Sequence, residues 1–114
     1  MGIKCASLLP HPPIIVDEIG GHELKKAQET VEGFKTTVEE IAELQEGIDL
    51  LVFITPHGPV FRSTASIIIR NELRGNFGDF GYPKLKFSEE SDTSFSEKLL
   101  EKAKKKNLSL QPLR

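Results

Sequence analysis

Two apolar runs in this chain end in the same four-residue pattern, Pro-His-x-Pro. The first run covers residues 3–9 and is followed by PHPP at 10–13, and the second covers residues 49–55 and is followed by PHGP at 56–59. Because proline has a fixed φ and no N–H, neither helix nor regular ladder pairing can continue through these patterns. The two short runs therefore predict buried strands, each ended by a stiff loop that carries one histidine.

Between these two runs lies a helical pattern. It extends over residues 22–46, with apolar residues at spacings of three and four that form one stripe: Leu24, Ala27, Val31, Phe34, Val38 and Ile41. Strand, helix and strand in this order predict a βαβ unit with parallel strands and a right-handed crossover. The unbroken apolar run at 49–55 is typical of a parallel sheet that is covered on both faces.

The second half of the sequence predicts further strands and one more helix. The expected elements are a strand at 64–70, a surface loop at 71–81, an extended segment at 82–87, a helix at 91–106 with Phe95, Leu99, Leu100 and Ala103 inward, and the start of a strand at 108–113. We therefore expect an α/β fold with a mostly parallel sheet flanked by helices, in one domain over residues 1–114.

Composition excludes several classes of partner. The net charge is −2, with acidic and basic residues interleaved, so no surface for nucleic acid or anionic lipid is expected. The sequence has no apolar run of membrane-spanning length, and its N-terminus lacks the features of a secretory signal. The single cysteine, Cys5, excludes an internal disulfide and indicates a reducing, cytoplasmic location. In mid-strand, Cys5 is expected to be a small buried residue.

The two histidines are expected to meet at one edge of the sheet. His11 and His57 each lie two residues beyond the end of an apolar run, and ligands bind beyond the carboxyl ends of parallel strands. Neighbouring strands are ~4.8 Å apart, and two imidazole nitrogens that share a metal, each at ~2.1 Å from it, are separated by roughly 3 Å. A two-histidine metal site is one interpretation, and a pair of stiff structural loops is the other.

Longer stretches around both histidines resemble a known family. LLPHPPIIV-x-EIG at 8–20 and I-x-PHGPVFR at 54–62 are similar to the class III extradiol ring-cleavage dioxygenases, in particular the catalytic, B-subunit or LigB-type superfamily, in the branch associated with Memo-like proteins. The resemblance covers the chain from Cys5 through FGDFGYPKLKFSEESD at 77–92.

The resemblance implies a non-haem Fe(II) held by two histidines and one carboxylate, with open positions for a catecholic substrate and O₂. By motif match, His11 and His57 are the two histidine ligands. The implied activity is an oxidoreductase of aromatic compound catabolism. Fe(II) is the expected metal, with another divalent metal such as zinc, or no metal in this chain alone, as the alternatives. A Memo-like protein of the same fold that binds a metal or a partner without cleaving catechols is the alternative function.

One departure from the family is decisive. Family members are well over twice as long, and their glutamate ligand and the acid/base histidine of an LDHG-like motif lie further along; these 114 residues contain no LDHG. The chain is therefore expected to be an N-terminal portion with an incomplete fold, inactive alone, and able to self-associate through an exposed sheet edge. Asp17 and Glu18 are the acidic residues nearest the first motif.

Other residues near the motifs are weaker candidates. Arg62, Gly58 and Pro12 are candidate substrate-binding residues. Arg62 could attract an anionic substrate group or pair with a carboxylate of the sheet, and Gly58 is expected to need a positive φ or a close approach beside His57. His22 is expected to be exposed at the start of a helix. The loop of Phe77 and Phe80 is interpreted either as a substrate lid or as a loop held against the core.

Overall fold

The computed structural model describes residues 2–44 and 47–114. By internal contacts the chain divides into two compact units, Met1–Leu51 with Gly78–Tyr82, and Val52–Phe77 with Pro83–Arg114. Each unit has its own local packing. That residues 1–114 form one domain stays a prediction.

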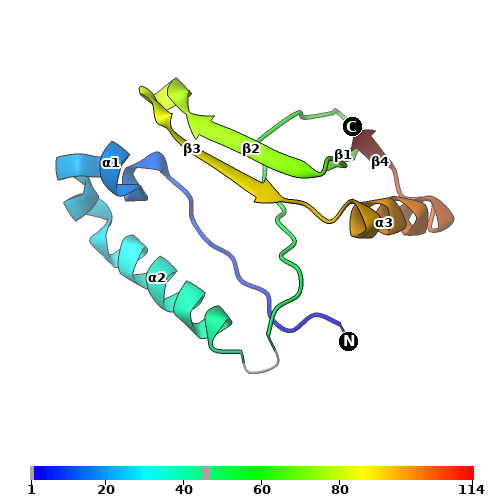
Figure 1. Cartoon of the computed structure of the whole chain (residues 1–114), viewed down its shortest axis with the longest axis horizontal. Coiled ribbons are helices and arrows are strands. Elements are labelled where there is room, and N and C mark those ends of the chain that lie inside the picture. The colour runs from blue at the N-terminus through cyan, green and yellow to red at the C-terminus, as the bar shows by residue number, and fades with distance from the viewer. Residues whose placement is uncertain (1, 45–46) are drawn as a thin grey trace. The chain divides into compact units, whose positions relative to one another are not determined.

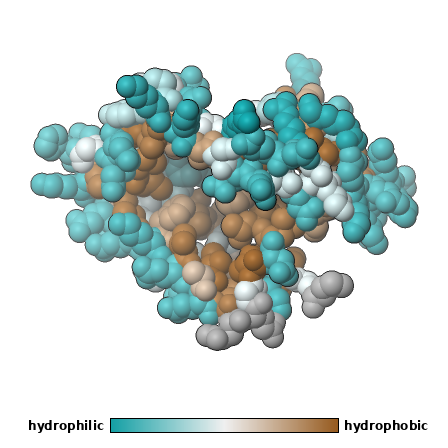
Figure 2. Space-filling view, viewed as in Figure 1, coloured by the Kyte–Doolittle hydropathy of each residue, from teal (hydrophilic) through white to brown (hydrophobic). Residues whose placement is uncertain are grey.

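The first unit is helical after its N-terminal segment (Figure 1). Its elements are the 3₁₀ helix η1 (Pro13–Ile15), the short helix α1 (Asp17–Gly20), the 3₁₀ helix η2 (Gly21–Ala27) and the helix α2 (Gln28–Ala42). The helix expected from residue 22 therefore begins as a 3₁₀ turn, and residue 46, its expected end, lies outside the described residues. The predicted apolar stripe is half-buried except for Val38, which is 46% exposed. In Figure 2 the outer side of α2 is hydrophilic, and apolar surface lies on the side of α2 that faces the N-terminal segment.

The expected strands at 3–9 and 49–55 are wrong as paired strands. Both segments lie outside the strands that the structure describes, and their apolar side chains are largely exposed, as Leu8 at 99% and Ile54 at 97% show. An isolated strand has neither a ladder partner nor an apolar layer to cover it. The apolar side chains of both runs would be stabilised by burial, but no described strand pairs with either run.

The second unit contains a βαβ arrangement. Strands β1 (Ala65–Ile68) and β4 (Leu110–Leu113) pair in parallel, with Ala65 opposite Leu110, and the helix α3 (Thr93–Lys105) precedes β4. Its buried apolar residues among those described are Ile69, Leu100 and Ala103, at 7%, 3% and 8% exposure. The α/β class, the strands near 64–70 and 108–113 and the helix near 91–106 are thereby confirmed. Phe95 and Leu99 differ from the prediction, because about two-fifths of each is exposed.

The small parallel sheet has two different edges. The Ile69 N–H donates to the Leu113 carbonyl at 2.8 Å, so Leu113 turns its backbone groups toward β1. Alternate residues of a strand turn these groups to opposite sides, which places Pro112 on the outer edge of β4. Because proline has no N–H, this edge is a poor template for another strand, whereas the outer edge of β1 contains no proline.

The predicted loop at 71–81 is wrong for most of its length, because Glu72–Phe77 forms strand β2. It pairs with β3 (Tyr82–Glu90), and the two strands run in opposite directions (Figure 1). The glycines of this segment are typical of a loop, but a Cβ at Gly75 would collide with the Phe87 ring. The glycine thus leaves room for a cross-strand aromatic ring, which supplies the cover that the glycine lacks.

The helix α3 begins and ends with local electrostatic support. The Asp92 side chain accepts a hydrogen bond from the Phe95 N–H at 2.8 Å, which satisfies one of the unpaired donors of the first turn. Lys102, Lys104 and Lys105 lie in the last turn, where cations are favourable. Within residues 2–44 and 47–114, no helix combines the length and the apolar character needed to cross a membrane.

Candidate metal site

The loop of His11 is held by turns that follow it immediately. Pro12 is extended, with φ −67° and ψ 141°, and its carbonyl accepts a hydrogen bond from the Ile15 N–H at 3.1 Å. The Pro13 carbonyl accepts from the Val16 N–H, also at 3.1 Å. Pro13 at the first position of η1 has the φ that the turn requires, so the chain is stiff on the C-terminal side of His11. The His11 side chain itself is exposed.

A close backbone approach fixes this turn to α1. Gly20 is the buried residue of α1, and its N–H donates to the Val16 carbonyl at 2.7 Å. A Cβ at Gly20 would collide with the Ile14 carbonyl oxygen and would lie 3.0 Å from the carbonyl carbon. Only glycine allows this packing. The packing role of Gly20 was not predicted from the sequence, and the EIGG run at 18–21 is the available signal for it.

The loop of His57 is held differently. The Thr55 hydroxyl oxygen accepts a hydrogen bond from the His57 N–H at 3.2 Å, across Pro56. Gly58 has a φ of +110°, and a Cβ there would meet no atom within 4 Å. The expected positive φ at Gly58 is thereby confirmed, and conformation rather than crowding requires the glycine. The side chain of His57 is exposed, like that of His11.

His11 belongs to the first unit and His57 to the second. That both imidazoles reach one metal therefore stays a prediction. Asp17 and Glu18 lie exposed in the first turn of α1. Among the described residues, no group of three or more histidine, cysteine, aspartate or glutamate side chains is placed to hold a metal ion.

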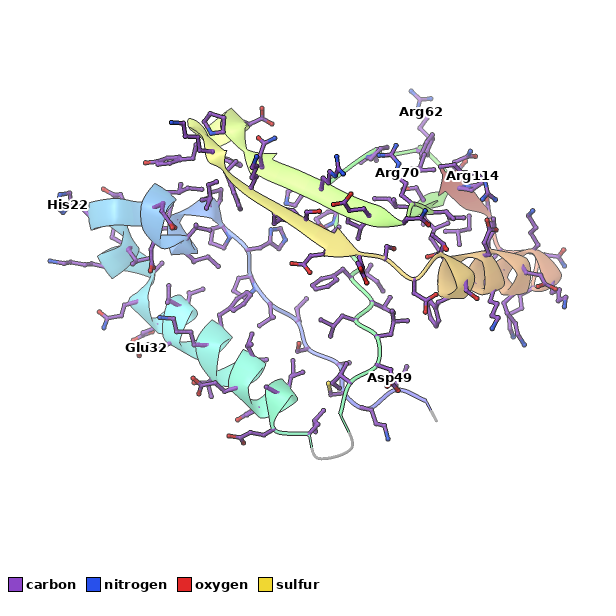
Figure 3. All side chains as sticks on the ribbon, in the orientation of Figure 1. His22, Glu32, Asp49, Arg62, Arg70 and Arg114 are labelled. Atoms are coloured by element: carbon purple, nitrogen blue, oxygen red, sulfur yellow. The ribbon has the colours of Figure 1, made fainter. Side chains whose placement is uncertain are left out.

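The weaker candidates also have defined positions. Arg62 is exposed and projects away from the ribbon (Figure 3), and none of the ion pairs in the described part of the chain involves it. The ion pair between Arg62 and a carboxylate of the sheet, one of the two alternatives, is thus not formed among the described residues. His22 is exposed and points outward, as expected (Figure 3). The buried position expected for Cys5 is wrong, because the segment that carries it is extended and exposed. Pro12 is exposed beside His11.

The resolved electrostatic effects lie on strand β2, on α3 and at Arg114, which follows β4. Hydrogen bonds from Arg74 and then Ser88 lower the pKa of the Glu72 carboxyl. A hydrogen bond from Arg114 lowers the pKa of Glu97, and the same contact raises the pKa of the Arg114 guanidinium. None of these groups belongs to either histidine motif, so they stabilise local structure in the second unit rather than prepare the candidate site.

The family model described as the catalytic LigB subunit of aromatic ring-opening dioxygenase matches residues 5–112. This chain belongs to the LigB family. The matched range contains both histidine motifs and ends within β4. The LigB-family chain is also 32% identical over 103 residues to Protein CA_C1420 of Clostridium acetobutylicum, and the aligned region covers 90% of this chain and 22% of that protein. The chain thus spans about a fifth of the length of this curated relative. No solved structure gives a significant match.

Proposed function

We propose that this LigB-family chain is the N-terminal part of a non-haem Fe(II) extradiol dioxygenase-like protein that opens a catecholic ring with O₂ in the cytoplasm. The family match over residues 5–112 carries the proposal. It includes both Pro-His-x-Pro patterns, and each histidine stands on a short loop that is stiffened by its own neighbours. Preordered loops reduce the entropy lost when two side chains are brought to one ion.

The chemistry of the donor set fits a divalent transition metal. Imidazole nitrogen is a ligand for Fe(II) and for zinc, and the side chains of His11 and His57 are both exposed. When bound, such a metal supplies Lewis acidity and the exchange of electrons between an aromatic diol and O₂. The residues of this chain would hold the metal through two imidazoles. Arg62, exposed and outside the described ion pairs, would attract the anionic form of the substrate, and Gly58 and Pro12 are further candidate substrate-binding residues.

The same donor set is incomplete for ring cleavage. A facial site needs a carboxylate beside the two histidines, and the described residues contain no cluster of three ligands. We therefore expect the 114-residue chain alone to bind a divalent metal weakly and to have no ring-opening activity. Catechol incubated with the iron-loaded chain should give no yellow ring-opened product by absorbance. Clear product formation would refute the claim that an essential group is missing.

Metal titration tests the site directly. Isothermal titration with Fe(II) under anaerobic conditions, or with Zn²⁺, should show weaker binding by roughly tenfold or more for His11→Ala and for His57→Ala, since a ligand is worth at least as much as its outer-shell partners. His22→Ala is the matched control, because His22 is an exposed histidine outside both motifs. Binding that is equal in the wild type and in both motif variants would exclude the shared site.

The same variants separate the proposed function from a Memo-like one in a longer protein that contains this chain. Ring cleavage that depends on His11 and His57 supports the dioxygenase. Metal binding that depends on both histidines, without cleavage of any catechol tested, supports the alternative of a metal- or partner-binding protein.

A further inference from the structure

We propose that Thr55 is a positioning residue for His57, acting through the hydrogen bond from the His57 N–H to its hydroxyl oxygen at 3.2 Å. Its effect on metal binding rests on the proposed function. Its effect on the backbone of the loop does not.

Local contacts and backbone constraints shape the loop around His57. The preceding run is exposed, with Phe53 at 81% and Ile54 at 97%, and belongs to none of the described strands. Pro56 fixes its own φ, and Gly58 adopts a φ of +110° that few other residues tolerate. His57 lies between these two residues, and neither of them fixes its backbone dihedral angles. A hydroxyl acceptor two residues earlier in the chain restrains that rotation by closing a short turn across Pro56.

The first histidine motif shows that this bond is a separate device. Leu9 occupies the position equivalent to Thr55 and has no side-chain acceptor. The loop of His11 is held instead by the turn of η1 and by the approach of Gly20 to Ile14. Two loops of the same sequence pattern thus use different contacts. The replacement Thr55→Val gives the second motif the apolar character of the first without supplying η1.

Two substitutions separate the hydroxyl from the shape of the side chain. Thr55→Val keeps the branched Cβ and removes the acceptor, whereas Thr55→Ser keeps the acceptor and removes a methyl group. Thr36→Val is the matched control, because Thr36 is an exposed threonine of α2 whose side chain makes no described hydrogen bond.

The first measurement is the exchange rate of the His57 amide hydrogen with water, by NMR on the full chain. A net hydrogen bond of ordinary strength corresponds to about a fivefold change in rate. Thr55→Val should therefore speed exchange at His57 about fivefold, and Thr55→Ser and Thr36→Val should leave it within roughly twofold of the wild type. An unchanged rate in Thr55→Val overturns the proposal, whether or not the chain binds metal.

The second measurement is Zn²⁺ affinity of the same variants. Thr55→Val should weaken binding several-fold, with Thr55→Ser close to the wild type and His57→Ala the weakest. Faster amide exchange with unchanged affinity overturns the positioning role and leaves a local structural one. If His57→Ala binds as the wild type does, the proposed metal site fails, and the exchange rates still decide what Thr55 does.

Discussion

Replacing Gly20 by alanine tests how the loop of His11 is held. Gly20 has helical dihedrals, φ −67° and ψ −44°, so alanine is locally compatible and favoured by about 1 kcal/mol in a helix. The added Cβ would collide with the Ile14 carbonyl oxygen and lie 3.3 Å from the Leu24 Cβ. Relief requires movement of backbone, which typically costs 1–3 kcal/mol in packed structure, about as much as or more than alanine gains. We expect Gly20→Ala to destabilise the first unit by up to about 2 kcal/mol, the cost of moving backbone less the gain from alanine.

The chain provides a matched control for this experiment. Gly33 lies within α2, and a Cβ there would meet no atom within 4 Å. Gly33→Ala should therefore stabilise the helix by about 0.5–1 kcal/mol. Urea unfolding followed by far-UV circular dichroism measures both changes.

Hydrogen exchange at the Ile15 and Val16 amides, which donate to Pro12 and Pro13, reports on the loop itself. Slower or unchanged exchange and higher stability in Gly20→Ala, with Gly33→Ala stabilised as expected, would refute the packing argument.

Three further predictions concern charge, metal and assembly. Arg114 lowers the pKa of Glu97. Their pair therefore stabilises the fold at pH values above 4.5, the ordinary pKa of the carboxyl, and this stabilisation is lost as the pH falls through the lowered pKa. In Arg114→Gln the pKa of Glu97, followed by ¹³C NMR, should rise, and an unchanged midpoint contradicts the contact. Metal binding to histidine releases protons, so Zn²⁺ affinity should be lower in acidic than in neutral solution, and calorimetry that shows equal affinity in both contradicts His11 and His57 as the ligands. Self-association should use the outer edge of β1, so Ile68→Lys should shift the size-exclusion profile at high concentration toward monomer, and a wild type that is already monomeric contradicts this.

Local features of the sequence predicted α3 and β4 well. The first turn of α3 is capped by Asp92 and its last turn contains lysines, so residues close in sequence determine where the helix begins and ends. Strand β2 was missed because glycine is typical of a loop, whereas the side chain that covers Gly75 is Phe87, twelve positions later and across the hairpin. The segments at 3–9 and 49–55 show the opposite error. Apolar runs predict that side chains need burial, but the partner strand that would bury them is not encoded within the run.

The same distinction explains what could be predicted of the candidate site. Prolines and the positive φ at Gly58 are properties of single residues, so stiff loops at His11 and His57 followed from the sequence. The contacts of Gly20 with Ile14 and of Thr55 with His57 depend on the path of each turn, and they were not predicted from the sequence. All these restraints nevertheless act within ten residues of a histidine. Each loop can therefore be ordered before any long-range strand pairing forms. Local structure then accounts for most of the conformational entropy that is lost when the two histidines are ordered.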